Sequence, residues 1–305
     1  MVAPNAYVPR FPGEEILVQG QPLFVRSAPC TASDGEPAVF IHGLGGMSSN
    51  WTELMALLSD RLESIAPDIP GFGMSPPPID SDYSPAAQAA VVADLVRTRF
   101  GGMPVHVFGN SMGGAIAVQF AARYPDLVKT VTLVSPALPE RVPRKSNIHM
   151  PVVAVPKVGE KLTQRMMLTT TTEQRVTATF DICYANMDRV NPQRFADAVE
   201  EAKEREKLPY VEVALLQSLR GLIGTYLDPG KNRPWKLAER IKAPVLLIYG
   251  RDDKLVNPKA ALRATRYFPN ARVVVVSDSG HVSQMEHPEL VAHAWEELVA
   301  SATNR

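Results

Sequence analysis

Short apolar runs alternate with amphipathic segments along most of the chain. The runs are rich in β-branched or aromatic residues and are bounded by glycine, proline or aspartate, as β-strands commonly are. They cover residues 38–41, 105–108, 128–135, 245–249 and 273–276. Because the runs are continuously apolar, we expect strands that are buried on both faces, in a mainly parallel central sheet flanked by helices.

Helical patterns occupy the spaces between these predicted strands. Residues 85–100 carry apolar side chains at helical spacing on one face. Further helices are predicted over residues 112–124, 258–267 and 286–300. Residues 16–27 alternate loosely around Gly20 and Gln21, which predicts an antiparallel hairpin that leads into the sheet.

The middle third of the chain has a different pattern. No convincing strand is found from about Leu138 to Arg240, whereas residues 192–206 and 211–227 have helical periodicity. A helical insertion in a sheet protein favours a lid over a site, and a second packing layer is the alternative. We therefore predict a core of residues 1–137 and 241–305, with residues 138–240 as an inserted helical cap.

Apolar residues in the predicted cap are candidates for the wall of a pocket. They are Leu215, Leu219, Leu222, Ile223 and Tyr226, at helical spacing, with Met166, Met167 and Leu168 upstream. Part of this surface must pack within the cap, and the remainder is expected to face the sheet edge. Unbranched methionine suits an adaptable apolar wall.

A G-x-S-x-G pentapeptide, residues 109–113, joins a predicted strand to a predicted helix. The pattern alone is weak, but a serine on a tight strand–turn–helix is typical of a nucleophile whose hydroxyl projects from the turn. Ser111 also precedes a helix N-terminus, where the dipole favours developing negative charge. These features make Ser111 a candidate nucleophile.

A serine nucleophile needs a general base and an orienting carboxylate. His281 follows the predicted strand 273–276, at the expected carboxyl edge of the sheet, and is the best placed histidine. The loop after residues 245–249 offers two adjacent carboxylates, Asp252 and Asp253. The remaining histidines are interpreted as structural residues (His106 and His293), a surface or capping residue (His287) and a less favoured substrate contact (His149).

Acyl transfer also needs two N–H donors for the oxyanion of its intermediate. We assign one to the backbone amide of Met112 and the other to that of Leu44, in the glycine-rich turn of residues 42–46. A plain structural turn is the alternative for this segment. His42 is interpreted as a hydrogen-bonding strut of the turn.

With these motifs, the chain resembles the α/β-hydrolase superfamily over nearly its whole length. The matching segments are residues 42–46, 68–75, 109–114, 250–258 and 280–288. The resemblance implies the α/β-hydrolase fold with a helical cap, Ser111 as nucleophile, His281 as base and Asp253 as acid. The candidate pocket residues are Phe72, Leu219, Ile223 and Val282, and packing is an equal alternative for Phe72.

Three branches of the superfamily can be compared. Haloalkane dehalogenases and epoxide hydrolases place aspartate at the elbow, which Ser111 argues against. Residues 109–114 resemble the meta-cleavage-product hydrolases, which cut C–C bonds, but Val282 stands where these usually have an aromatic residue. Their oxyanion turn also usually carries a G-x-G-P-type run, which this chain lacks. Carboxylesterases and monoacyl lipases fit without such a discrepancy.

The sequence therefore predicts a serine hydrolase that cleaves carboxylic esters of small to medium apolar acyl groups through an acyl-enzyme intermediate. A C–C bond hydrolase of the meta-cleavage-product type is the first alternative. A ligand receptor with little turnover on the same fold is the second. The expected partner is a small apolar ester, and neither a cofactor nor a metal is predicted.

Composition excludes several other classes of function. Lys plus Arg and Asp plus Glu both number 32, and this balance excludes a broad electrostatic footprint for nucleic acid or anionic membrane. The two cysteines belong to no metal-binding cluster and are expected as free thiols. Residues 1–15 contain no apolar signal region, and no stretch approaches the ~20 apolar residues of a membrane span, so the expected location is the cytoplasm. Residues 141–161 are basic and are either a lid edge that touches lipid or a solvated loop.

Overall fold

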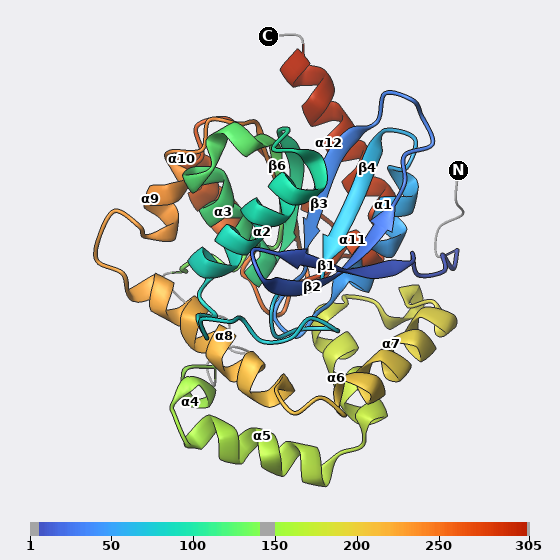
Figure 1. Ribbon diagram of the computed structural model, residues 1–305, viewed down its shortest axis with the longest axis vertical. Coiled ribbons are helices and arrows are strands. Elements are labelled where there is room, and N and C mark those ends of the chain that lie inside the picture. The colour runs from blue at the N-terminus through green and yellow to red at the C-terminus, as the bar shows by residue number, and fades with distance from the viewer. Residues whose placement is uncertain (1–5, 141–149, 304–305) are drawn as a thin grey trace.

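A computed structural model describes residues 6–140 and 150–303, and its sheet has eight strands in the order β1-β2-β4-β3-β5-β6-β7-β8 (Figure 1). The strands are β1 (Gly13–Val18), β2 (Gln21–Ala28), β3 (Glu36–Ile41), β4 (Leu62–Pro67), β5 (Val105–Asn110), β6 (Val128–Val134), β7 (Val245–Gly250) and β8 (Ala271–Val276). Strand β2 pairs antiparallel with β1 and β4, and every other pair is parallel. The predicted mainly parallel sheet is confirmed.

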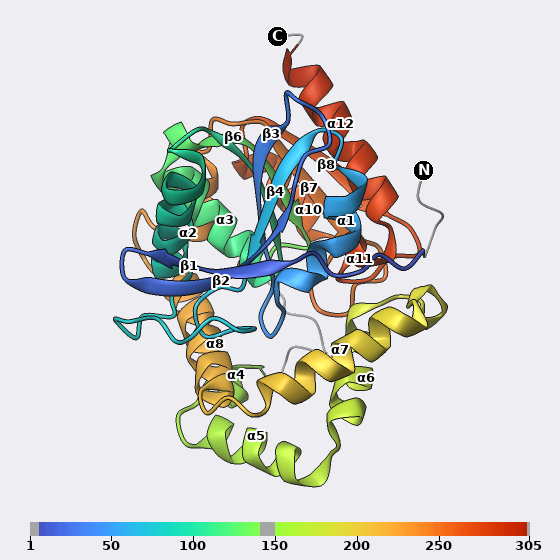
Figure 2. The ribbon, with the colours of Figure 1, turned by 45° about the vertical axis from the view of Figure 1, so that its right-hand side comes forward.

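Helices cover both faces of this sheet (Figure 2). On one face lie α2 (Pro85–Phe100), α3 (Met112–Arg123), α9 (Pro234–Ala238) and α10 (Ala260–Tyr267); on the other lie α1 (Thr52–Leu57), α11 (Ser283–Glu286) and α12 (Pro288–Thr303). Neighbouring residues of one strand enter different layers: Val39 belongs to the first apolar cluster and Phe40 to the second. Continuous apolar runs are therefore the pattern that strands between two helical layers require.

The structure contains two elements that the sequence patterns do not predict, strand β4 and helix α1. The pattern of β4 is unclear because the strand mixes polar residues with apolar ones and ends on Pro67, although its Ser64 is buried. The N-terminal hairpin is present, but its two-residue loop is Gln19-Gly20, with φ of 49° and 85°. Both residues are left-handed, as the twist of a two-residue hairpin favours, so Gln21 already begins β2.

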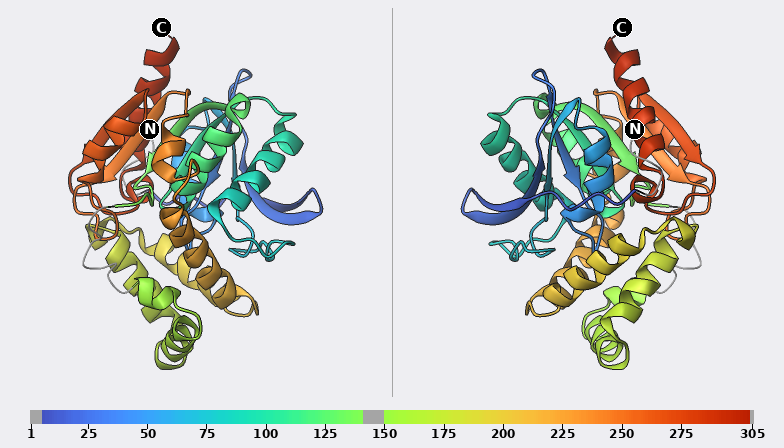
Figure 3. Two further views of the ribbon diagram at one scale, coloured as in Figure 1. Left: turned by 90° about the vertical axis from the view of Figure 1, so that its left-hand side faces the viewer. Right: turned by 90° about the vertical axis from the view of Figure 1, so that its right-hand side faces the viewer.

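Helices make up most of the described part of the segment between β6 and β7. They are α4 (Met150–Ala154), α5 (Val158–Thr169), α6 (Thr172–Cys183), α7 (Pro192–Arg205), α8 (Val211–Leu227) and the short α9, and the described part of this segment contains no strand. Helices α4–α8 form a layer beyond one end of the sheet (Figure 3). Helix α9 packs on the core instead, where the Trp235 and Tyr267 ring centroids lie 5.2 Å apart.

Two further sequence expectations can be compared with the structure. Across residues 6–140 and 150–303, no helix combines the length and hydropathy needed to cross a bilayer. Cys30 and Cys183 are both free thiols.

Candidate active site

Ser111 occupies a strained turn between β5 and α3. Its backbone has a φ of 53° and a ψ of −118°, a region that residues other than glycine rarely adopt. The turn is too tight for side chains on its flanks, because a Cβ atom on Gly109 would lie 2.5 Å from the Gly113 carbonyl oxygen. A Cβ atom on Gly113 would lie 2.1 Å from the carbonyl oxygen of Ile41. Both glycines are therefore required for the elbow to close.

His281 and Asp253 form a buried pair at the same edge of the sheet. The distance from His281 Nδ1 to Asp253 Oδ2 is 3.0 Å, and both side chains are almost inaccessible to solvent. The second carboxylate oxygen, Oδ1, accepts the amides of Leu255 and Val256 at 2.7 and 2.9 Å. The neighbouring Asp252 is exposed, so the structure pairs Asp253 and not Asp252 with the histidine.

The environment of Asp253 favours its charged form. Burial acts to raise the pKa of this carboxyl group, but the adjacent His281 and the hydrogen bonds that the carboxylate accepts outweigh it and hold the pKa below its ordinary value. An ionised carboxylate that accepts a hydrogen bond from Nδ1–H orients the ring. It leaves the unprotonated Nε2 to accept a proton from a donor in the site.

Asn110 joins the histidine loop to the elbow. Its side-chain amide donates to the carbonyl oxygen of His281 at 3.0 Å and to that of Val134 at 3.1 Å. Asn110 directly precedes Ser111, so one side chain holds the loop of the candidate base beside the candidate nucleophile. Sequence reasoning gave Asn110 no role, although it occupies the variable position of the pentapeptide before the serine.

The glycine-rich turn of residues 42–46 lies beside the elbow. A Cβ atom on Gly43 would come within 3.1 Å of the Ser111 Cβ atom. Within the described residues, the backbone amides of Leu44 and Met112 donate no hydrogen bond to the protein. Two N–H groups without protein acceptors next to a projecting serine are what an oxyanion site requires.

The direction of the Leu44 amide is fixed from behind. The carbonyl oxygen of Gly43 accepts hydrogen bonds from His42 Nδ1 at 2.8 Å and from the Gly46 amide at 3.0 Å. A trans peptide points its C=O and N–H in opposite directions, so these bonds orient the Leu44 N–H of the same peptide unit. His42 Nε2 accepts the Ile69 amide at 3.1 Å, which places the ring proton on Nδ1, and burial lowers the pKa of the ring. These contacts agree with the interpretation of His42 as a strut.

The end of α6 packs directly on the histidine loop. The His281 amide donates to the carbonyl oxygen of Cys183 at 2.6 Å. A Cβ atom on Gly280 would lie only 2.3 Å from the same oxygen, so the contact needs glycine before the histidine. The helical segment between β6 and β7 is thus part of the structure that positions the candidate base.

Glu286 holds both sides of this contact. Its buried carboxylate accepts the amides of Ala185 and Asn186, at 2.7 and 3.1 Å, and the amide of Gly280. Burial raises the pKa of Glu286, and the three amides partly offset this by favouring the carboxylate. The sequence analysis included Glu286 in a matching segment but assigned it no role, because its partners lie far away in the chain.

Glu286→Gln should destabilise the fold by about 1–3 kcal/mol, because the new amide nitrogen would face a backbone N–H donor. Urea unfolding followed by circular dichroism measures this difference. Glu289→Gln, on the exposed start of α12, is the matched control and should change stability by less than about 0.5 kcal/mol. Equal stabilities of the two variants would show that Glu286 does not hold the loop.

The predicted pocket residues lie in two loops and on helix α8. Phe72 is buried, and its ring centroid lies 5.6 Å from that of His42, beside the oxyanion turn. On α8, Leu219 is buried and Ile223 is half-buried. Val282 packs against α6 in a cluster with Val176, Phe180 and Tyr184.

Met166, Met167 and Leu168 do not form an apolar wall. They lie on α5 with exposed fractions of 43%, 41% and 88%, so this part of the prediction is wrong. Their helix packs on α4 and α8 rather than on the sheet edge. The periodicity of α8 identified the buried Leu219 and Leu222 but not Leu216, which is 1% exposed, and the short run of apolar residues on α5 gave no information about burial.

The other described histidines, His106, His287 and His293, have no contact with Ser111, Asp253 or the His281 ring among the described residues. His106 is buried in β5, and His293 is exposed on α12. Of the two expectations for His287, the surface position is wrong, because the residue is buried and its Nε2 lies 2.7 Å from the Asp278 carbonyl oxygen. The capping position is confirmed, because His287 is the C-cap residue of α11. His149 and the rest of residues 141–149 lie outside the described residues.

Comparison with known proteins identifies the class. A family model described as the alpha/beta hydrolase fold matches residues 37–288, so the chain belongs to this family and is a hydrolase of the α/β-hydrolase superfamily. It is 29% identical over 256 residues to Lipase 1 of Psychrobacter immobilis, covering 83% of this chain and 73% of the lipase. It is 27% identical over 301 residues to 2-hydroxymuconate semialdehyde hydrolase of Pseudomonas putida, covering 95% of both chains. The likeness to lipases supports ester hydrolase activity.

A solved structure confirms the fold independently of the sequence patterns. The crystal structure of a putative lipase from Acinetobacter baumannii AYE superposes with a TM-score of 0.77 at 22% identity, and the match covers 96% of this chain and 93% of that chain. At this identity the similarity establishes the α/β-hydrolase architecture alone.

Proposed function

We propose that this protein is a serine hydrolase that cleaves carboxylic esters of small to medium apolar acyl groups. The observation that carries the proposal is the buried hydrogen bond between His281 and Asp253, in a loop that Asn110 ties to the turn of Ser111. A histidine oriented by a carboxylate is the usual means of activating a serine hydroxyl.

The mechanism follows from the positions of these groups. His281 Nε2 removes the proton of the Ser111 hydroxyl as its Oγ attacks the ester carbonyl carbon. The resulting oxyanion accepts hydrogen bonds from the Leu44 and Met112 amides, and Asp253 stabilises the imidazolium. Collapse of the intermediate expels the alcohol, which takes the proton from His281. Water, deprotonated by the same ring, then releases the acid from the acyl-enzyme.

C–C bond hydrolysis is the second candidate. The similarity to 2-hydroxymuconate semialdehyde hydrolase over 95% of both chains favours it. Val282 and the plain oxyanion turn favour the ester hydrolase, as does the similarity to lipases. A non-catalytic receptor would not need the paired Asp253 and His281.

We also propose that α4–α8 act as a cap over the site, with a small apolar ester held between cap and sheet. The contacts of Cys183 with the histidine loop support this placement. A peripheral contact with lipid through residues 141–161, of which residues 141–149 lie outside the described residues, and a cytoplasmic location are further predictions from the sequence.

A serine-directed phosphonate tests the chemistry directly. Wild-type protein should hydrolyse p-nitrophenyl esters, and the phosphonate should abolish this activity while adding its mass to the peptide that contains Ser111. Hydrolysis that survives complete labelling, or labelling at a different residue, would contradict the proposal.

The acyl chain length should control the rate. We expect kcat/KM to rise from acetyl to at least butyryl or hexanoyl esters, by up to about fourfold per methylene, because each buried CH₂ contributes about 0.8 kcal/mol. The value should then fall when the pocket is full. The measurement is a series of p-nitrophenyl esters beside one dienoic diketo acid. Efficient cleavage of the diketo acid with negligible turnover of every ester would favour the C–C hydrolase.

A further inference from the structure

One face of helix α7 docks on the core through charged side chains, while its apolar side chains pack in the cluster of α6 and Val282. Arg194, Asp197, Glu201 and Arg205 recur at intervals of three or four residues, which places them on one face of the helix. We call these four residues the α7 seam. The side chains of Arg194 and Asp197 are only 7% and 6% exposed, which is unusual for charged groups unless they are paired.

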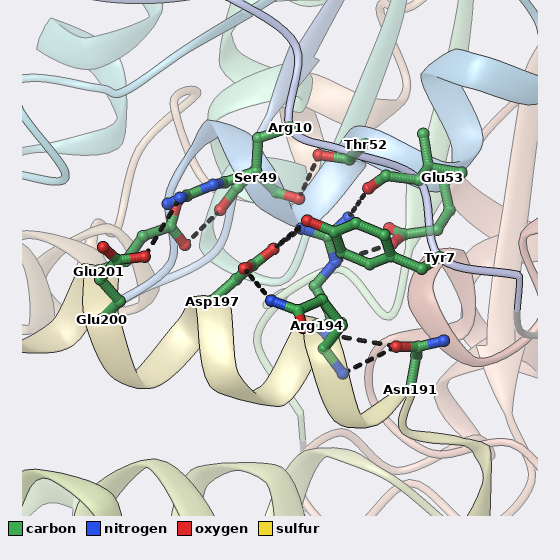
Figure 4. Close-up of polar contacts among 12 residues, drawn as sticks. Tyr7, Arg10, Ser49, Thr52, Glu53, Asn191, Arg194, Asp197, Glu200 and Glu201 are labelled. Carbon is green, nitrogen blue, oxygen red and sulfur yellow. Dashed lines mark hydrogen bonds and ion pairs between the residues drawn. The ribbon is translucent and has the colours of Figure 1, made fainter.

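The N-terminal half of the seam is paired with the core and with the start of the chain (Figure 4). Arg194 forms an ion pair with Glu53, at 2.7 Å, and donates to the carbonyl oxygen of Val8 at the same distance. The hydroxyl group of Tyr7 donates to Asp197 at 2.9 Å. Every charge in this half of the helix therefore has a partner outside the helical layer.

The C-terminal half of the seam reaches the segment around the oxyanion turn. Glu201 accepts a hydrogen bond from Ser49 Oγ at 2.9 Å and pairs with Arg10 at 3.1 Å (Figure 4). Arg205 Nη1 donates to the carbonyl oxygen of Gly45 at 2.9 Å. The seam thus holds residue 45 inside the turn and residue 49 just after it.

The contact at Gly45 bears on the geometry of the turn. Gly45 has a φ of 74°, and its carbonyl oxygen belongs to the second peptide unit after the one that carries the Leu44 amide. Within the described residues, Gly45 is the one hydrogen-bond acceptor of Arg205. Burial lowers the pKa of the guanidinium, and the charges of Asp68 and Glu201 oppose this. Asp68 also accepts the Ser48 amide at 2.7 Å, so the same carboxylate holds the backbone two residues after the turn.

We propose that Arg205 is a positioning residue for the oxyanion turn. Through the Gly45 carbonyl it holds residues 42–46 so that the Leu44 amide meets the developing oxyanion, which makes oxyanion stabilisation depend on the docking of α7. The inference rests on the ester hydrolase proposed above. It adds a cap residue that acts through the backbone and does not touch the substrate.

Arg205→Met should lower kcat for the best p-nitrophenyl ester by about 10- to 100-fold, less than the loss of a whole oxyanion donor. KM should stay within about threefold, because the turn acts on the transition state. Affinity for a trifluoromethyl ketone, which forms an oxyanion on the serine, should fall in parallel with kcat/KM. Arg205→Lys keeps a donor and should recover part of the loss.

Lys203→Met is the matched control, since Lys203 is an exposed cation on the same helix and is expected to retain wild-type kinetics. Melting temperatures and circular dichroism of all variants establish folding, and Arg205→Lys tests the proposal if Arg205→Met does not fold. An Arg205→Met enzyme with the kcat of the control would overturn the proposal. So would a loss confined to KM, which would make Arg205 a substrate contact. Wild-type protein that neither hydrolyses esters nor reacts with the phosphonate would instead overturn the proposed function.

Discussion

Replacing Ser111 by alanine should lower kcat for esters by about 10⁴-fold or more while the fold survives. The hydroxyl oxygen forms the covalent bond in the proposed mechanism, and no neighbouring group can replace it. The turn already accommodates a Cβ atom at a φ of 53°, so alanine adds no new clash. Initial rates with a p-nitrophenyl ester, measured beside circular dichroism spectra, give both quantities.

Ser81→Ala is a matched control for this variant. Ser81 is also a serine with positive φ, at 59°, but it is exposed in the loop between β4 and α2, and the variant should keep wild-type kcat. A Ser111→Ala enzyme that retained more than a tenth of the wild-type rate would remove Ser111 from the role of nucleophile.

Asp253→Asn should reduce kcat by about 10³-fold or more, because an amide that faces His281 Nδ1 favours the wrong tautomer of the ring. The 3.0 Å contact that the carboxylate makes is the basis of this expectation. Asp252→Asn should stay within about tenfold of wild type, since that exposed side chain has no contact with the ring. Steady-state rates of the two variants, prepared side by side, make the comparison.

The two asparagine variants control for each other because they remove the same charge one residue apart. A larger loss at position 252 would show that the carboxylate assigned from the loop sequence is off by one residue. Equal small losses would mean that His281 does not need an orienting carboxylate.

Much of the fold could be predicted because its strands are buried on both faces and its helix ends carry local signals. The helix of residues 85–100 was predicted with its observed limits: Ser84 caps its first turn, Pro85 begins it and Gly101, with a φ of 63°, ends it. Strand β4 lacked such a signal, since Ser64 lies inside the sheet and interrupts the apolar run.

The residues of the candidate site also differ in whether a local sequence pattern reveals them. Ser111 and the turn of residues 42–46 are marked by glycines that the local backbone needs, so a short pattern reveals them. The contributions of Glu286 and Arg205 depend on backbone groups that are distant in sequence, Ala185 and Gly45. A single sequence does not indicate which distant backbone groups a side chain will contact, so these two contributions could not be predicted.

The pairing of α7 with the start of the chain limits how far the helical layer can be regarded as a transferable module. Grafted onto another α/β-hydrolase, the layer would bring Arg194 and Asp197 without Tyr7 and Glu53, and these two charges would keep only each other, at 3.5 Å, as charged partners at a buried interface. In terms of design, the interchangeable unit is discontinuous: residues 6–12, Glu53 and the α7 helix belong to it together, although about 180 residues of chain separate residue 12 from α7.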